Sequence, residues 1–176
     1  MSDKNERPAW HARREISPFV LNDDAVGAVI NKASHAVVSW VTRNAEPVSA
    51  VMLYVVIDGR ITVTSTTNRA KYHAWRRNPA ASFCIWDPET IQRQVTLRGR
   101  IEIMQDTELL HRFTEAYLTR ARGGRPPSAE RLTAEIEKFE APDRHMMQLH
   151  VDKVLVTTSH GCLKLRPAVK MSGSRA

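Results

Sequence analysis

Apolar and polar residues alternate along much of the chain, and this alternation is typical of β-strands. It is clearest from Val95 to Ile103, where the odd positions are apolar apart from Gly99 and the even positions are polar. A glycine at such a position indicates a bulge or the close approach of another backbone. The pattern predicts six strands, at residues 36–42, 48–57, 60–66, 80–86, 95–103 and 145–158.

Two of these strands carry further signals. The strand 48–57 is so rich in β-branched and apolar residues that we expect both of its faces to be buried. Asp58-Gly59 follows it directly and predicts a tight hairpin turn into the strand 60–66. In the last strand the apolar positions change from odd to even numbers after Val151, which predicts a β-bulge or bend.

Capping residues and helical spacing predict four helices around these strands. Asn22, Asp106 and Ser128 are N-cap residue types, each followed by apolar residues at helical spacing. A shorter helix is expected between Arg69 and Asn78-Pro79, which would end it. Because the links between strands are short, we expect a mainly β (α+β) fold, an antiparallel barrel with peripheral helices.

The length of 176 residues suits one domain with its own core. We expect this domain to span residues 19–166, after a flexible, proline-punctuated N-terminal arm at 1–18 and before a disordered basic tail at 167–176. The apolar run 51–57 is too short to cross a bilayer, and the first residues lack the apolar segment of a secretory signal. These features predict a cytoplasmic protein without a membrane partner.

Charge and cysteine content narrow the classes of partner. The net charge of +7 suits a nucleic acid or a phosphorylated small molecule, but the basic residues are spread out and aromatic residues are only 6%. We therefore do not expect a nucleic-acid partner. Cys84 and Cys162 form no CxxC motif, so we expect no disulfide framework and no metal site, and both should be buried apolar residues.

The most informative motif is Arg69-Ala70-Lys71, at the start of the short helix. A helix N-terminus carries partial positive charge, so cations in its first turn are unfavourable unless an anion lies there. The preceding hydroxyl residues Thr64, Ser65 and Thr67 would add donors for a phosphate. Cations in the last turn, Arg76 and Arg77, need no ligand to explain them, because the helix dipole favours them there.

The order of these motifs resembles the pyridoxamine 5'-phosphate oxidase-like family of split β-barrel proteins, which bind flavins and deazaflavins. The resemblance covers about residues 34–161. The matching pieces, in chain order, are Glu46-Pro47, Thr64-Ser65, Arg69-Ala70-Lys71, Asn78-Pro79, and Arg93-Gln94-Val95 running into Arg98-Gly99.

The resemblance implies a six-stranded antiparallel split β-barrel and a homodimer with two cofactor sites at the subunit interface. In the family, the lysine that matches Lys71 grips the cofactor phosphate, the strand around Ser49 to Met52 lines the ring, and a glutamine like Gln94 contacts the cofactor. The cofactor-binding residues expected here are Ser49, Ala50, Val51, Met52, Thr64, Ser65, Arg69, Lys71 and Gln94.

The departures from the family pattern bear on substrate and cofactor. True pyridoxamine phosphate oxidases have an arginine where this chain has Ala50, and a Ser-Arg-Lys turn where it has Arg69-Ala70-Lys71. We therefore do not expect this protein to oxidise vitamin B6. The Arg-Ala-Lys turn looks more like the members that bind the deazaflavin coenzyme F-420, whereas residues 92–95 look more like the FMN-binding members. We favour FMN, since one phosphate needs fewer cations than a polyanionic tail.

The expected activity is an FMN-dependent oxidoreductase that transfers a hydride between the flavin and a small conjugated substrate. The alternatives are a deazaflavin-dependent reductase of the same fold and a flavin-binding or carrier protein without turnover. The catalytic residues are unknown, and His35 and His73 are the candidate proton donors. Trp40, Trp75 and Trp86 would either wall a ring pocket or fill the core.

Overall fold

Eight strands and four helices make up the residues that the computed structural model describes, 21–157 and 164–167. The helices are α2 (Asp23–Lys32), α3 (Ala70–Arg77), α4 (Thr107–Ala121) and α5 (Ala129–Phe139). The strands are β1 (His35–Val41), β2 (Pro47–Leu53), β3 (Val55–Ile57), β4 (Arg60–Thr66), β5 (Ala80–Asp87), β6 (Thr90–Met104), β7 (Arg144–Thr157) and β8 (Lys164–Pro167). The predicted arm at 1–18 and most of the predicted tail lie outside the described residues.

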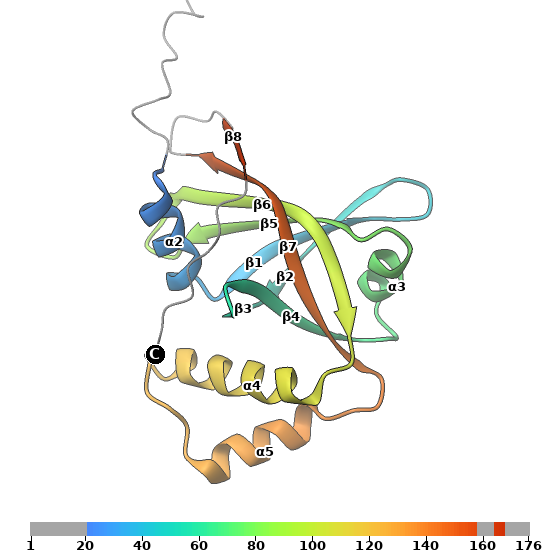
Figure 1. The fold of residues 1–176 in the computed structure, drawn as a ribbon, viewed down its shortest axis with the longest axis vertical. Coiled ribbons are helices and arrows are strands. Elements are labelled where there is room, and N and C mark those ends of the chain that lie inside the picture. The colour runs from blue at the N-terminus through green and yellow to red at the C-terminus, as the bar shows by residue number, and fades with distance from the viewer. Residues whose placement is uncertain (1–20, 158–163, 168–176) are drawn as a thin grey trace, which may run out of the picture.

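The strands form one antiparallel sheet in the order β2-β1-β5-β6-β7-β4-β3, with β8 paired to β7. Figure 1 shows the sheet curling into a half-barrel, with α4 and α5 packed together below it and with α2 and α3 at opposite ends. The predicted α+β class is confirmed, although the sheet has more strands than the six expected.

The strand predicted at 48–57 is two strands, β2 and β3, which meet at Tyr54. The Tyr54 backbone N–H donates to the Ser34 carbonyl, and its buried hydroxyl donates to the Ile30 carbonyl at 2.6 Å. The expectation that both faces of this segment are buried is wrong for β2. This strand lies at the end of the sheet, and its outward residue Val51 is 62% exposed.

The predicted turn and both predicted irregularities are present. Asp58 and Gly59 have φ angles of 51° and 71° and join β3 to β4, as a tight hairpin turn requires. The register between β6 and β7 shifts beside Gly99, which pairs with Val151, so Asp152 is the extra residue of a bulge. The glycine and the change of phase in β7 are thus two signs of one feature.

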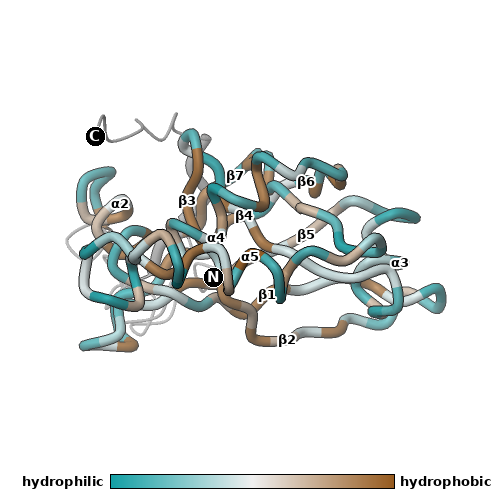
Figure 2. Tube along the Cα trace, turned by 90° about the horizontal axis from the view of Figure 1, so that it is seen from below, coloured by the Kyte–Doolittle hydropathy of each residue, from teal (hydrophilic) through white to brown (hydrophobic). Residues whose placement is uncertain are grey.

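Apolar side chains gather in two places. The larger cluster fills the inside of the curled sheet, where Trp75 lies edge-on to Trp40 and stacked against Phe83. The smaller cluster lies between the sheet and the helices α4 and α5, and includes Phe113 and Met146. Figure 2 shows β3, which belongs to this second cluster, in the hydrophobic colour.

Two of the three candidate tryptophans are therefore core residues, while Trp86 is half-buried. The expectation of a buried side chain is wrong in degree for Cys84, and Cys162 lies outside the described residues. The Cys84 side chain is only partly buried, because the face of the sheet that carries it is not fully covered in the described chain.

Candidate cofactor-binding site

The segment from Thr64 to Lys71 crosses from the end of β4 into the first turn of α3. Arg69 is the N-cap residue, but its side chain forms no cap hydrogen bond, and the first turn contains no acidic residue. The first N–H groups of a helix have no partner within it and carry the positive end of the helix dipole. Backbone donors and two cationic side chains therefore occupy one helix start.

Neither cation of this turn is neutralised by the part of the chain that the structure describes. Arg69 is exposed and Lys71 is half-buried, and no carboxylate within that part pairs with either of them. Burial, and secondly the nearby Arg69, lower the pKa of Lys71. An anion placed here would offset both effects.

The basic pair in the last turn of α3 is different, as the helix dipole predicts. Arg77 donates from Nη2 to the Val41 carbonyl at 3.0 Å, which ties α3 to the end of β1. The Arg76 guanidinium lies over the ring of Tyr72, 5.7 Å from its centre. Both last-turn arginines thus have partners within the protein, whereas the described residues provide none for the side chains of Arg69 and Lys71.

The hydroxyl groups predicted beside these cations point to opposite faces of β4, because neighbouring strand residues alternate. Thr64 is half-buried on the face of β4 that points toward α4, and it donates to the His145 carbonyl at 3.1 Å. Ser65 is 4% exposed, and its hydroxyl lies 3.4 Å from the Thr66 carbonyl. A single ligand group could reach only one of the two hydroxyls without a local rearrangement.

Arg144 is a residue near this segment that the sequence analysis missed. It pairs with Thr66 across β4 and β7, and its Nη1 lies 3.5 Å from the Thr64 hydroxyl. Its guanidinium lies over the Phe139 ring, its Nε is buried without a partner in the described chain, and burial lowers its pKa. The only sequence signal was a cation at the start of the last strand, which was predicted to begin one residue later.

Arg144 also lines a hollow of about 460 Å³ between the β6–α4 and α5–β7 connections. Asp106 and Glu140 lie on the same wall. Asp106 accepts the Leu109 N–H as the N-cap of α4, and Glu140 contacts His111. The hollow is therefore of mixed charge, and Arg144 is its one cationic lining residue within the described chain.

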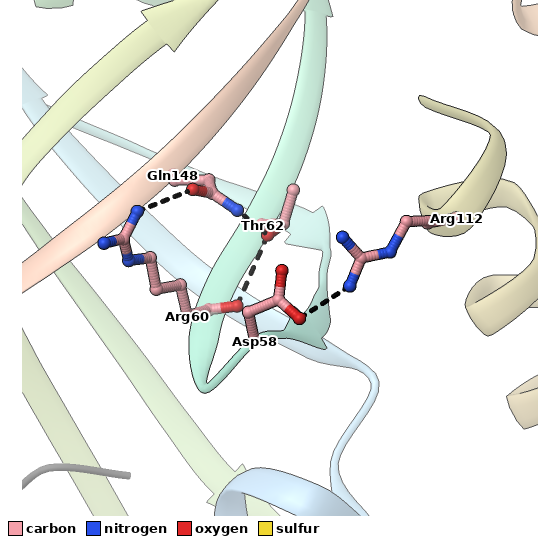
Figure 3. Close-up of polar contacts among 5 residues, drawn as sticks. All are labelled: Asp58, Arg60, Thr62, Arg112 and Gln148. Carbon is pink, nitrogen blue, oxygen red and sulfur yellow. Dashed lines mark hydrogen bonds and ion pairs between the residues drawn. The ribbon is translucent and has the colours of Figure 1, made fainter. Parts of the chain in front are cut away.

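β4 is held in place by a polar network on the face that it turns toward α4, where Thr62 and Gln148 are buried (Figure 3). Gln148 on β7 donates to the Thr62 hydroxyl at 3.2 Å and accepts from Arg60 at 3.3 Å. Beside them, Asp58 in the hairpin turn pairs with Arg112 of α4 at 2.6 Å. These contacts fix the strand whose far end leads into the Arg69–Lys71 turn.

The residues predicted to line the cofactor ring lie on β2, at the opposite end of the strand order from β4 and β3. Along β2, the side chains of Ser49 and Val51 point outward, whereas Ala50 and Met52 pack against the core. Directly paired residues of an antiparallel sheet share a face, so Val51 shares one with Val37 and Cys84. Cys84 Sγ lies 3.5 Å from Gln94 Oε1, which brings Gln94 to the same side.

The structure therefore brings the predicted residues together as two groups. The first is the Thr64–Lys71 segment, and the second is the outward face of β2, β1, β5 and β6. Within the described ranges, no side-chain hydrogen bond joins Ser49 or Gln94 to the first group. The bond from Arg77 to Val41 places α3 beside the β1 end that pairs with Pro47 of β2.

Each of the two candidate proton donors lies beside one of these groups: His35 is on the same face of β1 as Val37, and His73 follows Lys71 by two residues on α3. His35 is exposed at the start of β1 and contacts the Ser34 hydroxyl, and His73 is exposed on α3. Among residues 21–157 and 164–167, no three His, Cys, Asp or Glu side chains are arranged to hold a metal ion. No helix in these ranges is long and apolar enough to cross a membrane.

Comparison with known proteins gives the family. The family model described as pyridoxamine 5'-phosphate oxidase matches residues 23–158, most of the chain. The chain belongs to the pyridoxamine 5'-phosphate oxidase family. This finding confirms the resemblance carried by the Arg69–Lys71 turn and the Gln94 strand. The family and its structural neighbours include oxidoreductases and flavin-type binding proteins. No curated protein matches the chain.

Solved structures with the same fold are distant in sequence. The conserved hypothetical protein Rv2991 from Mycobacterium tuberculosis has a TM-score of 0.72 at 22% identity, over 93% of this chain and 99% of that one. An FMN-binding, pyridoxamine 5'-phosphate oxidase-related protein from Nostoc punctiforme PCC 73102 has a TM-score of 0.58 at 15% identity, over 79% of this chain and 85% of that one. A protein named F420 reductase has a TM-score of 0.51 at 19% identity, over 72% of this chain and 93% of that one. At these identities the likeness supports the fold alone.

Proposed function

We propose that this member of the pyridoxamine 5'-phosphate oxidase family is an FMN-dependent oxidoreductase that acts on a small conjugated substrate. The observation that carries the proposal is the pair Arg69 and Lys71, which lie at a helix start without a counter-ion in the described chain. The phosphate of FMN would supply the missing negative charge. Family membership makes a flavin-type cofactor the natural source of that phosphate.

The open face of β2 fits the other end of such a cofactor. A strand at the end of a sheet presents backbone N–H and C=O groups along its free edge, and these can pair with the polar edge of a flat ring. The outward residues Ser49 and Val51 would lie against the ring. The side-chain amide of Gln94, on β6, would donate a hydrogen bond to the ring or accept one from it. FMN itself would supply the hydride chemistry, and the protein would hold the ring and keep water away from it.

A second subunit would complete this site. Val51 is one of the few large apolar residues exposed in the described chain, and it lies within β2, next to the central residue Ala50. An exposed apolar residue on an open strand is typical of a protein interface. We propose a homodimer through this face. Val51→Asp should then reduce both the mass in solution and the affinity for FMN, whereas an unchanged dimer would contradict this interface.

The deazaflavin coenzyme is the alternative cofactor, and one observation favours it. Arg144 adds a third cation beside the Thr64 hydroxyl, and its Nε lacks a partner in the described chain. A longer polyanionic group could use this arginine in addition to Arg69 and Lys71. If the deazaflavin is the cofactor, Arg144→Gln should weaken its binding more than it weakens the binding of FMN.

The test of the proposed function is an absorbance spectrum of the purified protein, followed by separate titrations with FMN and with the deazaflavin. The double variant Arg69→Ala/Lys71→Ala should lower FMN affinity by about a hundredfold, since it removes two charge-assisted contacts of about 1.5 kcal/mol each. Lys138→Ala is the matched control, because this exposed lysine on α5 pairs with Glu135 of its own helix and is not part of the Thr64–Lys71 segment. Equal FMN affinity in the double variant and the control would overturn the phosphate assignment.

Turnover is tested separately from binding. If the protein is an enzyme, its reduced cofactor should be reoxidised by added conjugated acceptors, and the rate should saturate with the acceptor. If the protein is a carrier, the cofactor should bind as tightly but remain inert to each acceptor. Ala50 stands where true pyridoxamine phosphate oxidases have an arginine, so we expect no oxidation of pyridoxamine phosphate.

A further inference from the structure

A separate hollow of about 360 Å³ lies between α3, the end of β6 and the start of β7. None of its lining residues belongs to the proposed cofactor site, although Tyr72 follows Lys71 in the chain. Its walls combine apolar, aromatic and hydrogen-bonding side chains, as small-molecule pockets do. The lining residues that matter here are Tyr72, Trp75, Arg76, Ile101, Ile103 and His145.

Tyr72 and His145 form a pair on one wall. The His145 Nδ1 lies 3.2 Å from the Asp143 carbonyl, which can only accept, so this nitrogen carries the proton. Nε2 is then an acceptor, and the Tyr72 hydroxyl lies 3.5 Å from it. A contact of this length is weak. Both groups therefore keep most of their hydrogen-bonding capacity for a molecule in the hollow.

Trp75 contributes a second unsatisfied group. Its side chain is 1% exposed, and its Nε1–H has no acceptor in the part of the chain that the structure describes. A buried indole N–H normally has a partner, because losing its water without replacement costs free energy. A ligand oxygen that reached this group would provide the acceptor.

The hollow is lined by a cationic side chain without an acidic one beside it in the described chain. Arg76, whose guanidinium lies over the Tyr72 ring, is exposed, and no carboxylate within the described ranges pairs with it. No acidic residue is among the described residues that line the hollow. One planar guanidinium matches a carboxylate in shape and charge, and Ile101 and Ile103 offer an apolar surface for a ring.

We propose that this hollow binds a small aromatic carboxylic acid, with its ring against Ile101, Ile103 and Trp75 and its carboxylate on Arg76. The Tyr72 hydroxyl and the His145 Nε2 would position polar substituents of the ring. The site does not depend on the cofactor, so a failure here would leave the proposed function untouched, and the reverse also holds.

The test follows the tryptophan indole signals of nitrogen-15-labelled protein during a titration with naphthoate. The Trp75 signal, assigned from the Trp75→Phe variant, should shift and saturate at millimolar naphthoate or below. Naphthylmethanol has the same ring without the charge, and it should bind about tenfold more weakly, as expected for the loss of one charge-assisted hydrogen bond.

Two neighbouring arginines provide the matched variants. Arg76→Ala should weaken naphthoate binding by about tenfold and leave naphthylmethanol binding unchanged, because naphthylmethanol carries no charge for the guanidinium to bind. Arg77→Ala, whose arginine bonds Val41 and does not line the hollow, should bind naphthoate like the parent protein. Ile103→Phe should fill the hollow and abolish binding of both compounds while the circular dichroism spectrum stays unchanged.

Three results would overturn the proposal. The first is a Trp75 signal that does not respond to naphthoate. The second is an equal loss of binding in Arg76→Ala and Arg77→Ala, which would indicate a general charge effect. The third is unaltered binding in Ile103→Phe, which would place the naphthoate elsewhere.

Discussion

Gly99 on β6 lies so close to the His150 carbonyl on β7 that a Cβ atom at Gly99 would be 1.9 Å from the carbonyl oxygen. The neighbouring atom belongs to the backbone and cannot turn away as a side chain would. Gly99→Ala should therefore force the two strands apart at the bulge. We expect a loss of about 3 kcal/mol in the free energy of unfolding, at the upper end for overpacking, measured by urea denaturation.

Gly27 is the matched control for this substitution. It lies within α2, and a Cβ there would meet nothing within 4 Å. Gly27→Ala should raise the free energy of unfolding by about 0.5–1 kcal/mol, because alanine favours the helix. A Gly99→Ala protein as stable as Gly27→Ala would show that the β6–β7 pair tolerates a side chain at the bulge.

Arg120 on α4 joins three parts of the chain. Its Nη1 donates to the carbonyls of Ala33 and Tyr54, each at 2.9 Å, and its guanidinium lies 5.3 Å from the centre of the Tyr54 ring. Arg120→Met would leave both carbonyls without this donor. We expect a loss of about 2 kcal/mol or more in the free energy of unfolding, since each unsatisfied buried group costs about 1–3 kcal/mol.

Arg112→Met is the control for Arg120→Met, because Arg112 is an arginine on the same helix whose partner, Asp58, is exposed. Surface ion pairs contribute little to stability, so the loss should be clearly smaller. Equal losses in the two variants would mean that the two carbonyl bonds of Arg120 stabilise the fold no more than a surface ion pair does. The measurement is again urea denaturation, compared through the midpoint and the slope.

Local patterns predicted most of the fold because their causes are local. The caps are an example: Asn22 accepts the Ala25 N–H at 2.8 Å, Asp106 accepts the Leu109 N–H at 2.8 Å, and Ser128 accepts an N–H three residues on. Each of these bonds depends on residues within one turn. The strand alternation around Gly99 is local in the same sense.

The split at Tyr54 and the position of Arg144 could not be predicted in this way. The segment 48–57 is uniformly apolar, and the break arises because Tyr54 is held by the Ser34 carbonyl and by Arg120, which is 66 residues away. Arg144 lies near the candidate site because its guanidinium contacts Thr64, 80 residues earlier in the chain. Contacts at such separations are set by the packing of the whole chain, and no short motif encodes them.

Asp87 gives the protein a specific response to acid. The Glu89 backbone N–H and the Lys32 ammonium hold the pKa of this 4%-exposed carboxyl below its usual value. A lowered pKa in the folded state stabilises the protein above the unfolded-state pKa of about 3.9, and this stabilisation is lost as the pH falls through the folded value. The free energy of unfolding should therefore fall below about pH 4.

Asp87→Asn should make this acid-induced fall less steep, because the proton that drives it can no longer bind. The measurement is urea denaturation at several pH values between neutrality and acid. Asp152→Asn is the control, since Asp152 is exposed at the bulge in β7. If both variants lose stability in acid as steeply as the parent protein, Asp87 is not the group that titrates.

Lys71 should lower the stability of the ligand-free protein, which distinguishes a binding residue from a structural one. Its folded-state pKa is below the usual 10.5 because of burial and Arg69, so the charged form is disfavoured in the folded protein. Below that pKa the folded protein holds a charged lysine in an unfavourable site, which lowers its free energy of unfolding. Stability should rise with pH between the folded-state pKa and 10.5 as the lysine loses its proton in the folded protein. Lys71→Met should therefore raise the free energy of unfolding at neutral pH without ligand, and this gain should shrink toward pH 10.5. The variant should also lose the stabilisation that added FMN gives the parent protein.

Lys153→Met, at an exposed position on β7, is the control and should change neither quantity. A Lys71→Met protein that is less stable without ligand would show that Lys71 supports the fold, and the phosphate assignment would lose its main physical argument.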